Sequence, residues 1–67
     1  MKKVEEINLK NNNAELYALE YFDEPKGENQ EGNDIFFNED KTEFYIFEVS
    51  LAMYGILAIE QAINEMF

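Results

Sequence analysis

The sequence contains no cysteine, histidine, arginine or tryptophan. Without cysteine the chain can form no disulfide and has no thiolate chemistry. Without histidine it lacks the commonest metal ligand and the usual general base. Serine and threonine occur once each, and Ser50 has no plausible base beside it. A carboxylate pair such as Glu39 and Asp40 would need a cleft to do acid–base work, and a domain this small has little room for one. We therefore expect neither an enzyme nor a cofactor.

The acidic stretch from Asp23 to Asp34, DEPKGENQEGND, has the length of an EF-hand calcium loop. Such a loop requires oxygen ligands at its third and fifth positions and glycine at its sixth. Those positions hold Pro25, Gly27 and Glu28, and the last position is an aspartate one methylene too short. The match fails where the geometry is strictest, so we expect no metal site.

Positive charge is scarce. Fifteen Asp and Glu face five Lys, and the net charge is −10. On a globule about 28 Å across, this charge comes within a factor of about two of the density of DNA if it is gathered on one side. Direct binding to nucleic acid would then be repulsive, and docking to an anionic membrane would lack the necessary Lys and Arg.

Long hydrophobic runs are also missing. The longest charge-free run begins at Val49 and has 11 residues, whereas a membrane span needs about 20. The N-terminal MKKVEEINLK has no apolar segment typical of a signal peptide. We expect a single domain over residues 1–67 that is soluble in the cytoplasm of a bacterial host.

The first half of the chain predicts two strands and a loop, with no internal repeat evident. Residues 3–10 alternate weakly and indicate a strand, and the asparagines at 11–13 favour a hairpin turn. Residues 14–22 fit a strand, but they also fit a helix in which Asn12 and Glu15 form a capping box. Proline, glycines and the lack of apolar residues indicate an acidic loop over 23–33.

The second half of the chain predicts a β-hairpin followed by a helix. The hairpin has strands at 34–37 and 43–49 joined by a turn at 38–42, and its second strand is rich in aromatic and β-branched residues. Ser50 is a suitable cap for a helix over 51–67. One side of that helix is apolar and contains Ala52, Ile56, Ile59, Ile63 and Phe67.

These elements predict an α+β fold in which an antiparallel sheet of three or four strands carries the C-terminal helix on one face. The first half of that helix is apolar nearly all round, which is typical of a helix buried on more than one side. The strand at 43–49 also has apolar residues on both faces. One sheet cannot cover all of this surface, so we consider a homodimer through the C-terminal helix.

The excess carboxylates lie mainly in the middle of the chain. Residues 23–41 have a net charge of −5, compared with −1 for residues 1–22 and −4 for residues 42–67. Such a surface can simply keep a small apolar protein soluble, or it can pair with basic residues that normally hold phosphate. Aromatic residues nearby can serve as anchors of an interface or as core. The candidate partner-binding residues are Asp23, Glu24, Glu28, Glu31, Asp34, Glu39, Asp40 and Glu43.

In size, charge and Asn/Lys/Glu/Ile-rich composition, the chain is similar to small acidic proteins that bacteriophages encode against host enzymes. These include anti-CRISPR proteins, anti-restriction proteins and uracil-DNA glycosylase inhibitors. This resemblance implies a DNA-mimicking inhibitor of a basic nucleic-acid-binding protein, such as a CRISPR effector, a nuclease or a glycosylase. The alternative is an antitoxin-like or assembly protein that dimerises and binds its partner through apolar surface.

Overall fold

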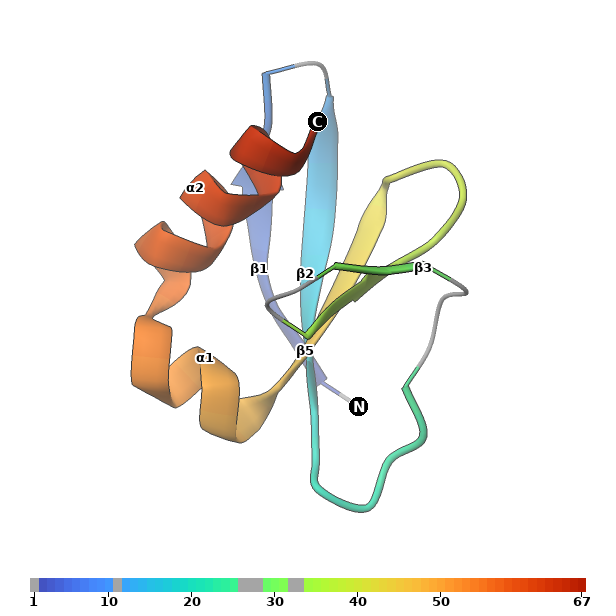
Figure 1. The fold of residues 1–67 in the computed structure, drawn as a ribbon, viewed down its shortest axis with the longest axis vertical. Helices are drawn as coiled ribbons and strands as arrows, with labels where there is room; N and C mark the ends of the chain where they lie inside the picture. The colour runs from blue at the N-terminus through green and yellow to red at the C-terminus, as the bar shows by residue number, and fades with distance from the viewer. Residues whose placement is uncertain (1, 11, 26–28, 32–33) are drawn as a thin grey trace.

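In the described part of the chain, the protein forms a five-stranded sheet with two helices on one face, as a computed structural model shows (Figure 1). The structure describes residues 2–10, 12–25, 29–31 and 34–67. This arrangement is an α+β fold, as predicted. In chain order the elements are β1 (Lys2–Asn8), β2 (Asn13–Leu19), β3 (Asn29–Glu31), β4 (Ile35–Phe37), β5 (Glu43–Phe47), α1 (Glu48–Tyr54) and α2 (Ile56–Met66).

The sheet is mixed and its strand order is β1-β2-β5-β4-β3, so the prediction of a three- or four-stranded antiparallel sheet is wrong in strand number and direction. β1 pairs antiparallel with β2, and β4 and β5 form the predicted antiparallel hairpin. β2 and β5 pair in parallel. β3 runs in the same direction as β2, and the chain then reverses twice, between β3 and β4 and again between β4 and β5, so that β5 lies parallel to β2.

Residues 13–19 form a strand, which excludes the helical alternative for this segment. Ala14, Leu16 and Ala18 are buried on the face that the helices cover, while Tyr17 and Leu19 point to the other face. β2 lies between β1 and β5, and its apolar residues on both faces suit a position that is partly covered on both faces. The strand ends at Leu19, earlier than the predicted boundary at 22.

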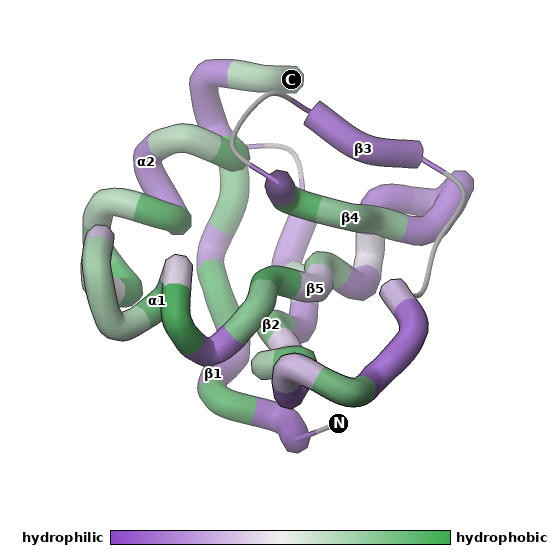
Figure 2. Tube along the Cα trace, turned by 60° about the horizontal axis from the view of Figure 1, so that its bottom comes forward, coloured by the Kyte–Doolittle hydropathy of each residue, from purple (hydrophilic) through white to green (hydrophobic). Residues whose placement is uncertain are grey.

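The acidic segment 23–33 was predicted as loop, but it contains the short edge strand β3. All three residues of β3 are exposed, and Figure 2 shows β3 as hydrophilic beside the more hydrophobic β4 and β5. β3 completes the sheet by pairing with β4, which requires no apolar side chains on β3. A polar edge strand also disfavours pairing with another chain. The predicted hairpin between β1 and β2 is confirmed, with the Leu9 amide donating to the Asn12 carbonyl at 2.9 Å.

The C-terminal segment forms two helices where one was predicted. α1 begins at Glu48, directly after β5, and Phe47 occupies its cap position without a side-chain hydrogen bond. The prediction that Ser50 caps the helix is therefore wrong, because Ser50 lies inside α1. Gly55 separates α1 from α2 with φ 85° and ψ 160°, a backbone conformation open essentially to glycine alone. Figure 1 shows the resulting change of direction.

The core lies between the sheet and α2. Phe44 on β5 and Ile63 on α2 are fully buried, and the ring of Phe67 packs edge-on against Phe37 at 5.0 Å between centroids. The predicted amphipathic second half of the helix is confirmed, and polar residues of α2 also bind the end of β1. The Asn8 amide donates to Glu60 at 3.3 Å, and the Lys10 amide donates to Asn64 at 2.9 Å.

Within the described parts of the chain, no helix has the length and apolar character that crossing a bilayer requires.

Candidate protein-interaction surface

Among the described residues, both helices lie on one face of the sheet (Figure 1), and we call its other face the open face. Residues paired across neighbouring strands point to the same face, so the strand register orders the open face in rows. The first row contains Glu6, Glu15 and Glu43, one from each of β1, β2 and β5. The second row contains Lys3, Tyr17, Tyr45 and Phe36, and the third contains Leu19 and Phe47.

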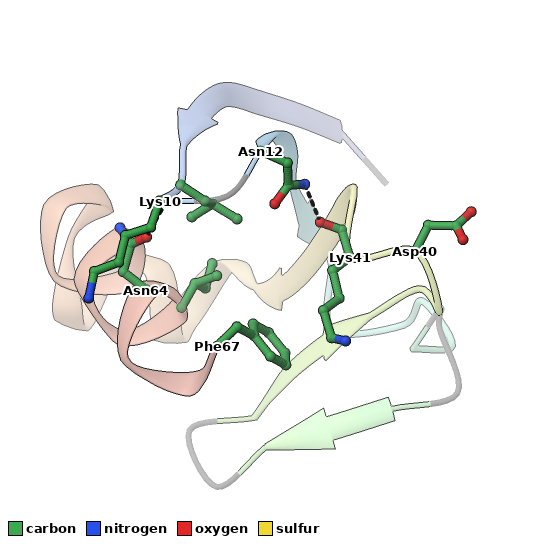
Figure 3. A pocket seen from close by; sticks show the side chains of 8 residues that line it. Lys10, Asn12, Asp40, Lys41, Asn64 and Phe67 are labelled. Atoms are coloured by element: carbon green, nitrogen blue, oxygen red, sulfur yellow. Dashed lines mark hydrogen bonds between the residues drawn. The ribbon is translucent and has the colours of Figure 1, made fainter.

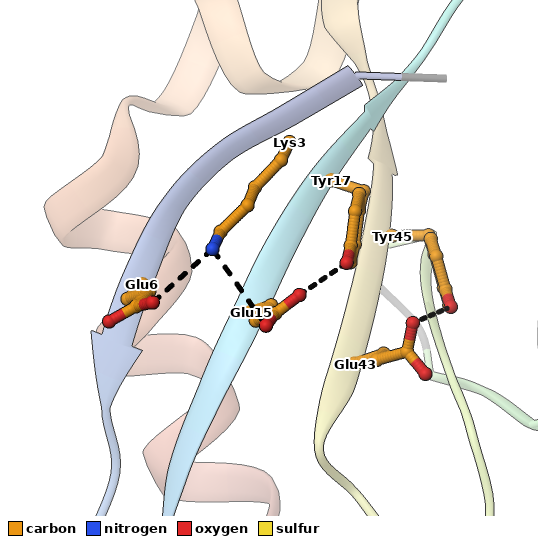
Figure 4. A network of polar contacts seen from close by, with 6 residues as sticks. All are labelled: Lys3, Glu6, Glu15, Tyr17, Glu43 and Tyr45. Carbon is orange, nitrogen blue, oxygen red and sulfur yellow. Dashed lines mark hydrogen bonds and ion pairs between the residues drawn. The ribbon is translucent and has the colours of Figure 1, made fainter.

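Polar contacts fix the first two rows to each other (Figure 4). The Tyr17 hydroxyl donates to Glu15, and the Tyr45 hydroxyl donates to Glu43 at 3.0 Å. The Lys3 ammonium lies 3.2 Å from Glu6 and 3.8 Å from Glu15. These ion pairs are exposed and contribute little to stability. Lys3 connects Glu6 to Glu15, whereas the position of the Glu43 carboxylate is set by its hydrogen bond from Tyr45.

The two tyrosines stack on each other with ring centroids 5.3 Å apart and an interplanar angle of 23°. The hydrogen bond to Glu15, followed by burial and the negative charge of Glu15, raises the pKa of Tyr17 to about 12. Burial, followed by the hydrogen bond to Glu43 and its charge, raises the pKa of Tyr45 to about 12. With the pKa of each raised, both phenols stay protonated and continue to donate to the carboxylates further into the alkaline range than a free tyrosine would.

The matched positions of the two Glu–Tyr pairs come from a short sequence repeat that was not predicted. The segment from Glu15 reads ELYALE and the segment from Glu43 reads EFYIFE. They pair in parallel and in register, Glu15 opposite Glu43 and Tyr17 opposite Tyr45. A comparison of the chain with itself, allowing exchange among apolar residues, would have found this signal.

Beyond the third row, the open face ends in a groove of about 350 Å³ beside the start of α1. Apolar side chains supply much of its lining, and two carboxylates join them. Tyr21 stands at the groove with 84% of its surface exposed. Among the described residues, the groove is lined by Leu19, Tyr21, Asp34, Phe47, Glu48, Val49 and Ser50.

The fold separates the predicted partner-binding residues. Glu43 alone joins the carboxylate row on the open face. Asp34 lines the groove, where its carboxylate accepts a hydrogen bond from Gln30 at 3.1 Å. Asp23 and Glu24 follow β2, and the carboxylate of Asp23 accepts the Glu20 amide at 3.0 Å. Glu31 is exposed on β3, and Glu39 and Asp40 are exposed in the β4–β5 turn. Glu28 lies outside the described residues.

Glu6, Glu15 and Glu48 were not predicted because they do not lie in the stretch where charge is dense along the chain. On a sheet, side chains that share a face are two residues apart within a strand or lie on different strands. The carboxylate row draws one residue from each of three strands, and two of those strands are far apart in sequence. Its assembly depends on the parallel pairing of β2 with β5, which was not predicted.

A second, smaller hollow of about 110 Å³ lies between the β1–β2 turn, the β4–β5 turn and the end of α2 (Figure 3). The Lys41 ammonium lies 4.9 Å from the centroid of the Phe67 ring. The side-chain amide of Asn12 donates to the Lys41 carbonyl at 2.9 Å. These contacts tie the two turns and the chain end together, so we assign this hollow a structural role.

The outer side of the helices exposes apolar side chains that we call the apolar stripe. Val49, Met53 and Leu57 are spaced four residues apart, and their exposed fractions are 67%, 74% and 81%. Tyr54 beside them is 54% exposed, and α1 contains no buried residue. The apolar start of the predicted helix is therefore largely exposed in the single chain, not buried on several sides.

Within the described residues, no three Asp or Glu side chains are arranged to hold a metal ion. Comparison of the chain with protein-family models, with curated proteins and with solved structures finds no match.

Proposed function

We propose that the chain is a small acidic inhibitor, encoded by a phage, that binds a nucleic-acid-handling protein in the cytoplasm of a bacterial host. In this proposal its carboxylates occupy a basic cleft where phosphates normally lie. An anti-CRISPR role, directed at a CRISPR effector, is the form we favour over inhibition of a nuclease or a glycosylase. The partner is a protein, and the inhibitor itself does not bind nucleic acid or membrane.

The carboxylate row on the open face carries this proposal. Neighbouring strands are about 4.8 Å apart, so Glu6, Glu15 and Glu43 repeat at roughly that interval. One DNA strand presents a phosphate per about 3.4 Å of helix axis. The Lys3 ammonium offsets part of the charge of the row, yet the chain keeps a net charge of −10. A basic cleft would therefore meet a regular series of carboxylates in place of a series of phosphates.

Preorganisation also supports the proposal. The carboxylates of Glu15 and Glu43 are each held by a tyrosine on the same strand, and the strands are fixed by sheet pairing. A partner would therefore order few side chains when it binds, which lowers the entropic cost of association. Tyr17 places partly exposed aromatic surface next to the carboxylates, above the buried Tyr45 ring, and aromatic residues are common anchors in protein interfaces.

The test is retention of basic proteins from a bacterial lysate on the immobilised chain, followed by elution with salt or with double-stranded DNA. Because charge pairing drives the proposed binding, the partner should elute as salt rises and should also be displaced by DNA. Mass spectrometry identifies the eluted proteins. Retention that ignores both salt and DNA would contradict the proposal.

A matched pair of variants locates the binding surface. Glu15→Gln with Glu43→Gln removes two charges from the row but keeps side chains that can accept the tyrosine hydroxyls. Glu5→Gln with Glu65→Gln removes two exposed charges elsewhere. We expect the first variant to lose most of the retained partner and the second to keep most of it. Equal losses would show that only total charge matters.

A second candidate function is a dimeric interaction module, and the apolar stripe favours it. The segment from Val49 to Ile59 contains no charged residue, so it offers a surface where two highly acidic copies can approach with least repulsion. Exposed apolar patches of this kind mark interaction sites. In this proposal two chains pack stripe to stripe, and Val49, which also lines the groove of the open face, lies at the border of that contact.

A change in salt concentration distinguishes the two candidate functions, because salt should weaken binding of a basic partner and strengthen dimer formation. Screening weakens binding of the acidic row to a basic partner, but it relieves repulsion between two acidic copies. Sedimentation at low and high salt should show more dimer at high salt, and Met53→Ser with Leu57→Ser should abolish it. Tyr21→Ser with Phe22→Ser, which removes two exposed aromatics elsewhere, is the control. A monomer at every salt concentration would rule out the dimer.

A further inference from the structure

We propose that the groove at the end of the open face binds an arginine side chain of the basic partner. This inference rests on the proposed function and extends it from a charged face to one specific contact. The groove differs from the carboxylate row in having both apolar walls and carboxylates. That combination matches a side chain with an aliphatic stem and a charged head.

The size of the groove restricts its occupant. Its volume of about 350 Å³ is at the lower end of the range of about 300–1,000 Å³ typical of small-molecule sites. It can hold a side chain of the partner but not a helix or a strand. Phe47 and Val49 can contact an aliphatic stem, as Arg stems pack along apolar surface while the head stays polar.

The charges of the groove determine the chemistry of that side chain. Asp34 and Glu48 both line it, so an apolar or anionic group placed there would leave two carboxylates without a countercharge. A guanidinium can pair with a carboxylate through two parallel N–H bonds. The Ser50 hydroxyl at the same groove can accept another.

Tyr21 favours arginine over lysine. Its ring is exposed at the groove and packs edge-on against Phe22, with centroids 5.7 Å apart. A planar guanidinium stacks on an aromatic face, whereas a lysine ammonium is a compact and strongly hydrated charge. Arginine is also among the residues that dominate the binding energy of protein interfaces. The groove would thus hold the anchor and the carboxylate row would orient the partner.

The test uses the intact chain and three short peptides, acetyl-Gly-X-Gly-amide with arginine, lysine or citrulline at X. Citrulline has nearly the shape of arginine but no charge. Amide chemical shifts of the protein are followed by nuclear magnetic resonance at low salt. We expect saturable shifts at Tyr21 and at residues 47–50 with the arginine peptide, and binding about tenfold weaker or more with citrulline, as loss of a charged hydrogen bond implies.

Two variants tie those shifts to the groove. Glu48→Gln and Asp34→Asn remove one charge each, and asparagine tolerates the positive φ of 58° at position 34. Each should weaken binding of the arginine peptide, while Glu65→Gln on α2 should not. Equal binding of the citrulline or lysine peptide, or shifts that these variants leave unchanged, would overturn the assignment to arginine. Loss of salt-sensitive partner retention in the Glu15 and Glu43 variant is a separate result and tests the proposed function alone.

Discussion

The Tyr17 ring stacks on the Tyr45 ring across the parallel pairing of β2 and β5, at 5.3 Å between centroids. Each hydroxyl donates to the glutamate two residues earlier on its own strand. The pair therefore couples the seam of the sheet to the carboxylate row. Disturbing one tyrosine should change both the stability of the sheet and the position of a carboxylate.

The first prediction concerns alkaline stability. The pKa of both tyrosines is raised from 10.0 to about 12 in the folded protein, so their contribution to stability is complete below pH 10 and is lost as pH rises through about 12. Urea unfolding at several alkaline pH values should show a falling free energy of unfolding in this window. Tyr17→Phe with Tyr45→Phe should make that fall shallower, and an unchanged slope would contradict the assignment.

A second prediction contrasts two residues of α2. Ile63 is fully buried, whereas Leu57 is 81% exposed. Ile63→Ala should lower the free energy of unfolding by about 2–5 kcal/mol because it leaves a cavity in the core. Leu57→Ala should change it by no more than about 0.5 kcal/mol when measured at low protein concentration. If urea unfolding showed similar losses of unfolding free energy for both variants, the assignment of Ile63 to the core and Leu57 to the surface would be wrong.

Gly55 provides a third prediction. A Cβ atom at this position would meet nothing within 4 Å, so any cost of substitution comes from the backbone. Gly55→Ala should destabilise the fold by about 1–3 kcal/mol, because φ 85° with ψ 160° is essentially closed to L-residues. D-alanine introduced by chemical synthesis has the mirror-image preference and should be tolerated. If both forms unfold at the same temperature as the natural chain, the helix break does not depend on this conformation.

Asn38 provides a fourth prediction, about the β4–β5 turn. Its side-chain oxygen accepts the amides of Thr42 and Glu43 at 2.9 and 3.0 Å. Asn38→Ala leaves both donors without this partner and should cost about 1–3 kcal/mol in thermal or urea unfolding. Asn38→Asp keeps the acceptor and should cost less, although it adds a charge near Glu43. A larger loss for aspartate than for alanine would show that charge, not hydrogen bonding, governs the turn.

Local patterns predicted β1, β4 and β5 but left Asn13–Leu19 open between a strand and a helix. The weak alternation near β1, the aromatic content of Glu43–Phe47 and the asparagine turn after β1 each reflect interactions between near neighbours in the sequence. β3 escaped prediction because an edge strand needs no apolar residue. The break at Gly55 was missed because a single glycine is also tolerated within a helix, and only its backbone angles distinguish the two cases.

The candidate surface was less predictable than the fold. The sequence indicates an excess of carboxylates, but not which of them share a face. That depends on the pairing of β2 with β5, a contact between distant segments. Of the residues proposed from the sequence, Glu43 and Asp34 lie on the surface that the structure favours, and Glu15 and Glu48 had no local signal of their own.

The parallel seam between β2 and β5 also has a consequence for how the chain folds. The β1–β2 and β4–β5 hairpins each join neighbouring segments and can form rapidly, whereas the seam must close a long stretch of chain first. We expect the two hairpins to form early and the seam to complete the native state. The carboxylate row, which crosses that seam, would then exist only in the fully folded molecule.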